Sequence, residues 1–330
     1  MFRPIFAILL GCALAGQSSA CDLCAVYNAD TANGGGAAGA TLSVAEQFIT
    51  HDTPQLDGRE LPTSFLDEAF LDSSTTHLVP AWNFGERFGL SLNIPYVHKR
   101  FKRFEQTVTG FGSESGTESG LGDLSLIARF TVYRTSSPNG SFFVNVLGGL
   151  EFPTGDADRV AEEVAVTRAL DVLYGPGHQH AVSGVHLRDL ALGSGSWDGV
   201  FGVTANSRWR RLVFNAQFQY YLRTPGEADY EYGDEWMLSG GPGVFLFLCD
   251  NFSLSVQALA TYDKMQPDTV LGRGNRNTGM TAIYLGPQLS LTVGRKFSAN
   301  LGVDLPVKID NDGLQNVPDL RLHGGISWRF

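Results

Sequence analysis

Cysteines supply the most reactive side chains of this 330-residue sequence, and two of them stand close together near its beginning. Cys21 and Cys24 form a CxxC pattern, a spacing that suits a disulfide, a thiolate metal site or a haem attachment. Haem attachment is discounted, because Ala25 occupies the position at which that motif needs histidine. Cys249 lies far away along the chain, at the end of an alternating apolar segment.

The first twenty residues have the composition of a secretory signal peptide. Arg3 supplies the positive start, the segment 5–15 supplies the apolar core, and Ser18-Ser19-Ala20 supplies a small-residue cleavage site. Cleavage there makes Cys21 the first residue of an exported chain in an oxidising compartment. Leu9-Leu10-Gly11-Cys12 resembles a lipoprotein cleavage box instead, but that reading leaves an implausibly short leader.

Three thiols beyond the signal peptide leave two readings. In the first, Cys21, Cys24 and Cys249 together bind Cu(I) or Zn(II) through their thiolates. In the second, Cys21 and Cys24 form a disulfide and Cys249 is inert. The second reading is favoured, because nothing in the sequence positions the Ala/Gly-rich tether 32–40 over Cys249.

Composition restricts the class of protein. The net charge of -10 argues against nucleic acid as a partner, because phosphate binding needs clustered Lys and Arg. A charged fraction of 18%, 39 glycines and a mean hydropathy of -0.04 are typical of a β-rich chain. Beyond the leader, no uninterrupted apolar stretch is long enough for a membrane helix, so an exported chain of this kind enters a membrane only as a closed barrel. No cofactor is expected.

From residue 74 onward, apolar and polar residues alternate as they do in strands with two different faces. The segment 40–50 is the least regular member, because Glu46 falls on its apolar side. The alternating segments are 40–50, 74–84, 88–97, 121–133, 141–152, 197–206, 212–222, 236–248, 252–262, 282–293, 297–309 and 319–330. Their connections are alternately short and long, like the periplasmic turns and outer loops of an outer-membrane barrel. The sequence therefore predicts an all-β fold, a transmembrane antiparallel up-and-down β-barrel of about 12 strands over residues 40–330, after a periplasmic segment over 21–39.

Aromatic residues on the apolar faces are sorted by strand end. Those beside the short turns are Trp82, Phe84, Phe88, Phe142, Phe252, Phe297, Trp328 and Phe330. Those beside the long loops are Tyr96, Phe152, Trp197, Tyr220, Trp236 and Tyr262. Two aromatic rings with an aliphatic band between them match the interfacial girdles of a membrane barrel, whereas a large soluble β-protein gives no reason for this sorting.

The last strand carries its own signal. Gly325, Trp328 and the terminal Phe330 resemble the C-terminal pattern by which the outer-membrane barrel-assembly machinery recognises its substrates. The last strand must also pair with the first, so that no backbone edge faces lipid. We therefore expect two partners, the barrel-assembly machinery and the lipid bilayer of the outer membrane of a Gram-negative bacterium.

The polar faces of the predicted strands point into the barrel. The pore-lining residues predicted from this alternation are Asp123, Arg129, Asn145, Glu151, Asp198, Gln217, Gln257, Asp304, Lys308 and Arg321. A lining of amides and of both charge signs suits a selective channel for small polar or amphipathic solutes. The alternative is that the charges pair across the lumen and brace it shut.

The connection 153–196 is the longest in the sequence. Its segment from Asp158 to Leu173 places apolar residues at helical spacing, which predicts a short amphipathic helix. Two roles are open for this loop: it folds into the mouth as a constriction, or it caps the surface.

Three motifs point to a family. Gly120-Leu121-Gly122-Asp123-Leu124, Phe152-Pro153-Thr154-Gly155-Asp156 and Tyr232-Gly233-Asp234-Glu235 resemble, in order and spacing, the outer-membrane family associated with the MetA pathway of phenol degradation. The resemblance covers about residues 75–330 and implies passage of small, aromatic or amphipathic solutes across the outer membrane. The family carries no catalytic residues to transfer.

The sequence thus favours a porin-like channel or transporter for a small-molecule solute, with loop 153–196 as a candidate gate. A membrane-embedded hydrolase is disfavoured, because no His-x-Ser pair occurs in the chain. The alternative function is a metal-handling or structural barrel that uses the CxxC pattern at the periplasmic mouth.

Overall fold

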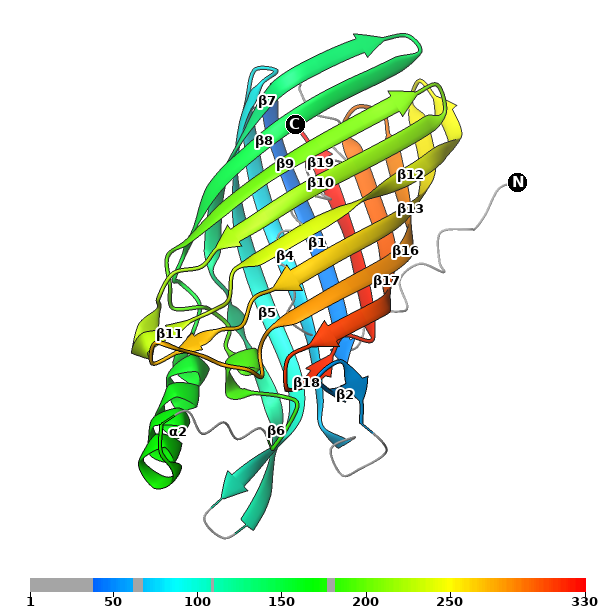
Figure 1. Ribbon diagram of the computed structural model, residues 1–330. Coiled ribbons are helices and arrows are strands. Elements are labelled where there is room, and N and C mark those ends of the chain that lie inside the picture. The colour runs from blue at the N-terminus through cyan, green and yellow to red at the C-terminus, as the bar shows by residue number, and fades with distance from the viewer. Residues whose placement is uncertain (1–37, 62–67, 108–109, 177–181) are drawn as a thin grey trace, which may run out of the picture.

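The computed structural model describes residues 38–61, 68–107, 110–176 and 182–330, and most of them form one antiparallel barrel (Figure 1). Its wall consists of β1 (Gly39–His51), β4 (Phe70–Phe84), β5 (Phe88–Thr107), β7 (Leu124–Ser137), β8 (Gly140–Phe152), β9 (Asp198–Trp209), β10 (Leu212–Leu222), β12 (Glu235–Cys249), β13 (Phe252–Met265), β16 (Met280–Val293), β17 (Phe297–Asn311) and β19 (Leu320–Arg329). The sheet has 13 strands, of which β6 (Gly110–Leu121) pairs only with β5. The wall therefore has the predicted 12 strands.

Closure of the barrel is made by the two ends of the chain. β1 pairs with β19 on one side and with β4 on the other, and β4 pairs with β5. The expected pairing of the last strand with the first is confirmed by ten residue pairs, from Thr41↔Arg329 to Thr50↔Leu320. A closed wall leaves no sheet edge whose N–H and C=O groups would face lipid.

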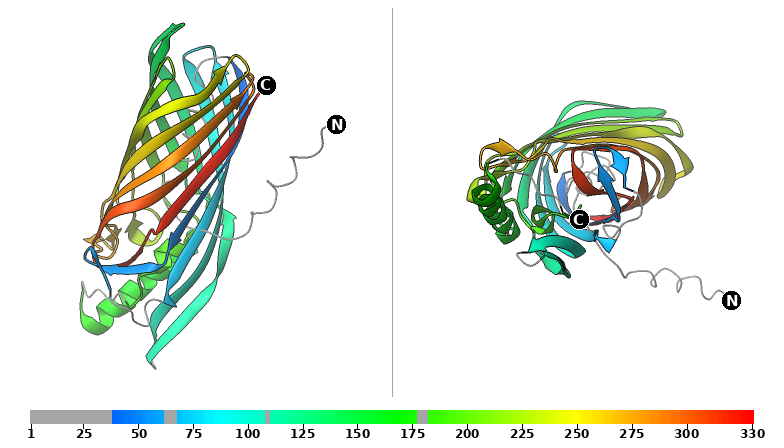
Figure 2. Two further views of the ribbon diagram at one scale, coloured as in Figure 1. Left: turned by 90° about the vertical axis from the view of Figure 1, so that its right-hand side faces the viewer. Right: turned by 60° about the horizontal axis from the view of Figure 1, so that its bottom comes forward.

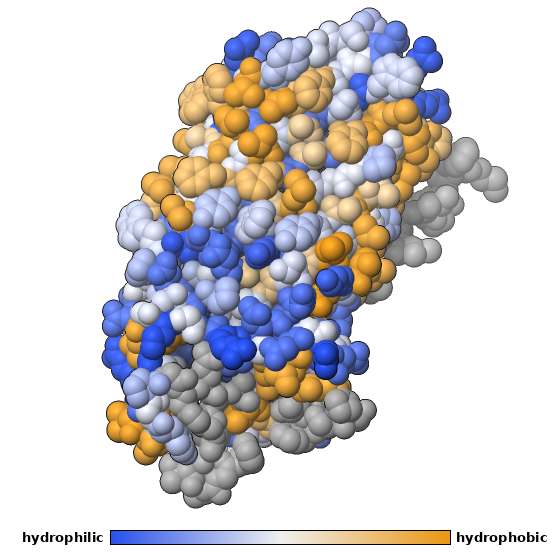
Figure 3. Space-filling view, viewed as in Figure 1, coloured by the Kyte–Doolittle hydropathy of each residue, from blue (hydrophilic) through white to orange (hydrophobic). Residues whose placement is uncertain are grey.

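Alternation in each strand separates two environments. In β19, Arg321, His323 and Ser327 are buried, whereas Ile326 and Trp328 are 52% and 48% exposed. The exposed set forms an apolar band on the face seen in Figure 3, with a hydrophilic zone toward the long loops. The barrel is thus polar inside and apolar outside, the reverse of a soluble protein.

Aromatic rings border this band at both ends, as predicted. At the short turns, Trp82 contacts Phe84, with ring centroids 6.5 Å apart. Phe297 and Trp328 meet there as well, at 6.1 Å. At the long loops, the ring contacts are Phe152 with Trp197 at 5.2 Å and Trp236 with Tyr262 at 6.1 Å. These two girdles locate the interfaces of a membrane.

The long loops carry most of the remaining structure. Two small sheets form there, one from β2 (Thr53–Leu56), β3 (Arg59–Glu60) and β18 (Leu314–Val317), the other from β11 (Tyr230–Glu231), β14 (Thr269–Val270) and β15 (Arg273–Gly274). Helix α2 (Asp158–Tyr174) confirms the predicted helix and lies beside the ring of strands (Figure 2). The predicted apolar stripe is wrong in its outer part, because Val160 and Val164 are buried whereas Val166 and Leu173 are exposed. The short 3-10 helices are η2 (Leu187–Leu190) and η3 (Glu227–Asp229). Among the described residues, no helix is both long and apolar enough to cross a membrane.

One predicted loop is in fact a hairpin. The connection 98–120, expected to be irregular, continues β5 to Thr107 and returns as β6, with residue pairs from Tyr96↔Leu121 to Thr107↔Gly110. The sequence did not predict these strands, because the segment consists mainly of charged and small residues. Such residues occur here because the extension lies beyond the apolar band.

The predicted signal peptide, residues 1–20, and the N-terminal segment with Cys21 and Cys24 lie outside the described residues. Described structure begins at residue 38, and β1 starts at the short-turn end of the barrel, where Gly39 pairs with Asn83.

Deleting Phe330 is expected to slow assembly in cells while hardly changing the stability of the folded barrel. The Phe330 side chain is 69% exposed, and the residue's N–H donates to the Ala40 carbonyl at 3.0 Å. Losing that one hydrogen bond costs about 1 kcal/mol. The measurement is the fraction of heat-modifiable barrel in the outer membrane, beside urea unfolding of the refolded protein. F330W, which keeps the aromatic terminus, is the control, and normal assembly of the truncated chain would contradict the assembly-signal hypothesis.

Candidate functional site

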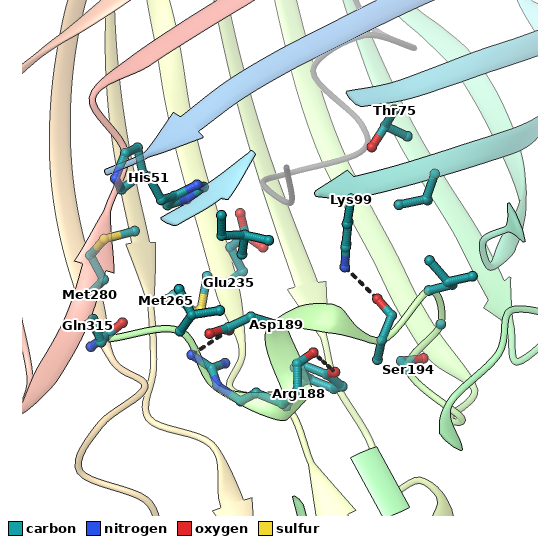
Figure 4. A pocket seen from close by; sticks show the side chains of 18 of the residues that line it. His51, Thr75, Lys99, Arg188, Asp189, Ser194, Glu235, Met265, Met280 and Gln315 are labelled. Carbon is teal, nitrogen blue, oxygen red and sulfur yellow. Dashed lines mark hydrogen bonds and ion pairs between the residues drawn. The ribbon is translucent and has the colours of Figure 1, made fainter. Parts of the chain in front are cut away.

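The second half of the longest loop enters the barrel. Residues 183–196, here called the plug, cross the space enclosed by the strands, with η2 at their centre (Figure 4). Val185 and Leu190 of the plug are 1% and 0% exposed and pack against Leu71 of β4 and Phe101 of β5. Lys99 of β5 donates a hydrogen bond to the Ala191 carbonyl. Of the two roles open for loop 153–196, the plug takes the inward one and α2 the outer one.

Asp123 holds both ends of this loop. Its carboxylate accepts the backbone N–H groups of Thr154 at 2.9 Å and of Gly155 at 2.8 Å, where the loop leaves β8. It also accepts the N–H and hydroxyl of Ser194 at 2.6 and 2.8 Å, where the plug ends. Asp123 is 6% exposed, and four donors match the capacity of one buried carboxylate. A single side chain therefore ties the start of the loop to the end of the plug.

A second anchor holds the centre of the plug. Arg188 pairs with the fully buried Asp268 at 2.8 Å and with Asp189 at 3.2 Å. Tyr230 donates its hydroxyl to Asp268, and Tyr232 donates its hydroxyl to the Arg188 carbonyl at 3.1 Å. Burial alone would raise the pKa of Asp189, but the charges of Arg188 and His186 outweigh it and lower that pKa below its ordinary value. The plug is consequently held by ionised groups at neutral pH.

The three family-like motifs meet at these anchors. Asp123 belongs to the first, and the carbonyl of Asp156, from the second, accepts the N–H groups of Leu192 and Gly193 at 2.9 Å. In the third, Gly233 donates to Asp268 at 2.8 Å, and Asp234 accepts the Tyr220 hydroxyl at 2.6 Å. The three motifs therefore act together: they attach the plug and its neighbouring loop to the barrel wall.

Most predicted pore-lining residues face the interior. Those buried on the inward face are Asp123, Arg129, Asn145, Glu151, Asp198, Gln257, Asp304 and Arg321. Gln217 is half-buried and lines a cavity inside the barrel. Their inward position follows from strand alternation, which held over these segments.

Lys308 is a correction to that set. Between the pairs Tyr284↔Pro306 and Ile283↔Lys308 the register shifts by one residue, because Val307 is an extra residue in β17. A one-residue bulge turns every later side chain of the strand to the opposite face. Lys308 is therefore exposed and shares the outward face with Ile283.

Several charges inside the barrel are paired, as the bracing alternative predicted. Arg223 contacts Glu151 at 2.7 Å and Asp198 at 2.8 Å. Arg321 contacts Asp263 at 2.8 Å, and both side chains are almost fully buried. Pairing lowers the free-energy cost of burying these charges. Charges within a pair cancel, so the net charge of the lumen is set by what remains uncancelled.

Space nevertheless remains between these braces, including three cavities lined by described residues. The loop-side cavity, about 210 Å³, lies against the plug, with Lys99, Glu235 and Met265 in its wall (Figure 4). The central cavity, about 40 Å³, is lined by polar side chains from eight strands: Gln47, Thr204, Asn206, Asn215, Gln217, Ser239, Thr261, Gln288, Asp304, Arg321 and His323. The turn-side cavity, about 220 Å³, lies between β8 and β17 near the short turns.

Shared residues connect the three cavities in series. Arg321 lines both the loop-side and the central cavity. Asn206, Asn215 and Gln288 line both the central and the turn-side cavity. A volume of about 40 Å³ holds only a few water molecules. The central cavity is therefore the narrow point of an axial path, and the plug covers its loop-side end.

Sequence reasoning missed several residues of this site. Arg188, Arg223 and Asp268 lie in loops, where alternation gives no signal. Gln315 and Asn316 of β18 also turn inward, and the Asn316 N–H donates to the Gly184 carbonyl of the plug at 2.7 Å. The sequence predicted the connection 310–318 only as one of the long loops.

The predicted thiolate metal site stays a prediction. Cys249 is exposed and has a free thiol at the short-turn end of β12, while Cys21 and Cys24 lie outside the described residues. Within the described part of the chain, no group of three His, Cys, Asp or Glu side chains is placed to hold a metal ion.

A family model described as "Putative MetA-pathway of phenol degradation" matches residues 68–185, and this match confirms the resemblance carried by the first two motifs. No curated protein matches the chain.

Among solved structures, the COG4313 outer membrane channel from Pseudomonas putida F1 superposes with a TM-score of 0.57 and 14% identity, covering 89% of this chain and 96% of that one. The β domain of the Bordetella autotransporter BrkA gives 0.46 and 9%, covering 89% and 100%. The toluene transporter TodX of P. putida gives 0.36 and 10%, covering 88% and 90%. The first of these supports the fold of an outer-membrane barrel.

Proposed function

Because residues 68–185 of this chain belong to the family described as "Putative MetA-pathway of phenol degradation", we propose that the protein is an outer-membrane channel for small aromatic or amphipathic solutes. The barrel lies in the outer membrane of a Gram-negative bacterium, with its short turns and both chain termini in the periplasm. The plug acts as its gate. The observation that carries this proposal is the series of three cavities inside a closed wall, covered at one end by a loop segment.

Mixed side chains in the loop-side cavity suit an amphipathic solute. Leu71, Val97, Met265 and Met280 give it apolar surface, and Lys99 supplies a nearby cation. Methionine sulfurs make favourable contacts with aromatic rings and adapt to irregular shapes. A small molecule with an apolar body and a polar end therefore finds a matching partner for each part.

The plug can act as a gate because its attachments differ from those of the wall. Wall strands are held by long ladders of backbone hydrogen bonds to both neighbours. The plug is held by small apolar contacts, by side-chain anchors at Asp123, Asp268 and Lys99, and by a few isolated backbone hydrogen bonds. Segments with few apolar contacts and side-chain anchors open at a lower free-energy cost than a ladder does.

Single-channel conductance tests this function. Residues 183–192 are replaced by a Gly/Ser linker of equal length, and the refolded protein is measured in a planar bilayer. We expect current steps several times larger than those of the native chain. The matched control replaces residues 165–174, the outer part of α2, with the same linker and leaves the steps unchanged.

The outcomes separate the parts of the proposal. Equal, small steps in both variants mean that the central cavity and not the plug limits the current. Silence in the native chain and in both variants overturns the channel function.

A further inference from the structure

The turn-side cavity differs from the other two cavities in its charges. Five acids and four Lys or Arg residues line the loop-side cavity, and Asp304, Arg321 and His323 line the central one. Among the described residues that line the turn-side cavity, Arg208 of β9 is the one charged side chain. The short turns at this end carry five cations against two acids: Arg87, Arg210, Arg211, Arg295 and Lys296, and Glu86 and Asp250. In a chain with a net charge of -10, the turn-side end of the lumen is therefore a positive region.

Arg208 faces this cavity without a carboxylate partner. It lies opposite Ser141 of β8 and Val213 of β10, and both of these residues line the same cavity. Its guanidinium donates one hydrogen bond, to the Arg210 carbonyl at 3.4 Å, and takes part in no ion pair among the described residues. A guanidinium has five N–H donors, so most of those on Arg208 are left for an anion.

A second donor lies on the same face of β9. Asn206 is 7% exposed, lines the cavity beside Arg208, and its Nδ2 has no hydrogen-bond partner among the described residues. Residues two apart on a strand point to the same side, so the Asn206 amide and the Arg208 guanidinium face one space. A buried donor without a partner costs free energy until an acceptor reaches it. A carboxylate supplies acceptors for both groups at once.

Two aromatic rings complete the lining. Phe143 of β8 and Phe245 of β12 border the cavity, although the inward positions of a barrel wall are normally polar. Phe143 lies opposite Asn206, and Phe245 lies opposite Ser255, which also lines the cavity. The cavity measures about 220 Å³, and a cavity of about 150 Å³ is enough to hold benzene. A ring-sized ligand therefore fits here and meets apolar surface.

From these observations we propose that the turn-side cavity binds a small aromatic carboxylate, of which benzoate is the simplest example. The Arg208 guanidinium holds the carboxylate, Asn206 donates from Nδ2 to one of its oxygens, and Phe143 and Phe245 contact the ring. The proposal rests on the channel function above and names the class of its solute. An anion is drawn towards the positive end of the lumen, from which it leaves into the periplasm.

Titration calorimetry of the refolded full-length barrel in detergent micelles tests the ligand class. The probes are benzoate, acetate, phosphate and benzyl alcohol at pH 7. We expect benzoate to bind about tenfold more tightly than acetate and phosphate, which lack the ring, and than benzyl alcohol, which lacks the charge. Equal affinity for benzoate and phosphate would reveal a general anion site and overturn the proposal. Equal affinity for benzoate and benzyl alcohol would overturn it as well.

Variants locate the binding in this cavity. R208Q removes the guanidinium and should weaken benzoate binding about tenfold, whereas N206L removes the unpaired donor and should weaken it about threefold. The matched control is R211Q, which loses the same charge from the exposed turn after β9 and should bind benzoate like the native chain. Urea unfolding verifies that each variant is folded. Equal benzoate affinity in R208Q and R211Q overturns the site.

Chemical protection gives a readout that needs no variant. Phenylglyoxal modifies accessible arginines, and mass spectrometry of the peptides measures the modification of each one. Saturating benzoate should slow modification of Arg208 several-fold and leave Arg211 unchanged, and benzyl alcohol should protect neither. Current steps from the barrel without protection of Arg208 overturn the site and leave the channel standing. Protection of Arg208 in a barrel that stays silent after plug replacement overturns the channel and leaves the site.

Discussion

Replacing Asp123 with alanine is expected to release the plug and raise single-channel conductance. The substitution removes the acceptor of four hydrogen bonds, from Thr154, Gly155 and Ser194, at 2.6 to 2.9 Å. Hydrogen bonds to a charged group contribute about 1.5–3 kcal/mol each, and the loss is shared because the loop rearranges. We expect the plugged state to lose about 3 kcal/mol, which shifts its population relative to the open state by more than about 100-fold.

Two controls isolate the anchor. D123N keeps an acceptor oxygen with the same shape and should give an intermediate open fraction. D250A removes a carboxylate at the opposite end of the barrel, in the exposed turn after β12, and should leave the conductance unchanged. The recording counts the open fraction per channel. An unchanged open fraction in D123A would show that Arg188 and Asp268 hold the plug by themselves.

Replacing Arg321 with alanine is expected to destabilise the barrel and to make the axial path prefer cations. Arg321 is 2% exposed, pairs with Asp263 at 2.8 Å, and lies over the Tyr284 ring at 3.9 Å. Breaking a buried pair leaves the remaining charge uncompensated and costs about 3–5 kcal/mol. Asp263 and Asp304 then dominate the junction of the loop-side and central cavities, so the reversal potential in a KCl gradient should shift toward that of potassium.

The reciprocal variant gives the opposite sign. D263N leaves Arg321 as the excess charge and should shift the reversal potential toward that of chloride. The double variant R321M/D263L removes both charges and should recover most of the stability in urea unfolding, because two apolar side chains of similar length need no partner. Equal reversal potentials in R321A and D263N would mean that ions do not pass this junction.

Alternation alone was enough to place the wall of this protein. Each strand between the girdles keeps one face in water and the other in lipid, so a period of two is enforced along β19 from Leu320 to Arg329. The prediction failed where that constraint ends. Lys308 lies just after an extra residue in β17, and a bulge leaves no mark in hydrophobicity that distinguishes it from a normal strand end.

The hairpin of β5 and β6 was missed for a related reason, because it lies outside the region in which lipid enforces alternation. Beyond the apolar band the outer face of a strand no longer meets lipid, and the buried face of β5 carries Lys99 as well as Phe101, so residues 98–120 show no clear alternation of apolar and polar residues. The sequence did predict the helix over residues 158–174, because the spacing of its apolar residues is a local pattern. Val160 and Val164, one turn apart, pack against neighbouring loops.

The sequence by itself determined the barrel, its strand number and its two aromatic girdles, since these follow from local periodicity and from the position of each residue along its own strand. Only the tertiary structure decided that residues 183–196 fold inward and that Asp123 holds both ends of their loop. It also placed Arg321 opposite Asp263. Arg321 and Asp263 are 58 positions apart in the chain, and Ser194 and Asp123 are 71 positions apart. No local pattern records such distances, because they are set by the curvature and register of the closed sheet.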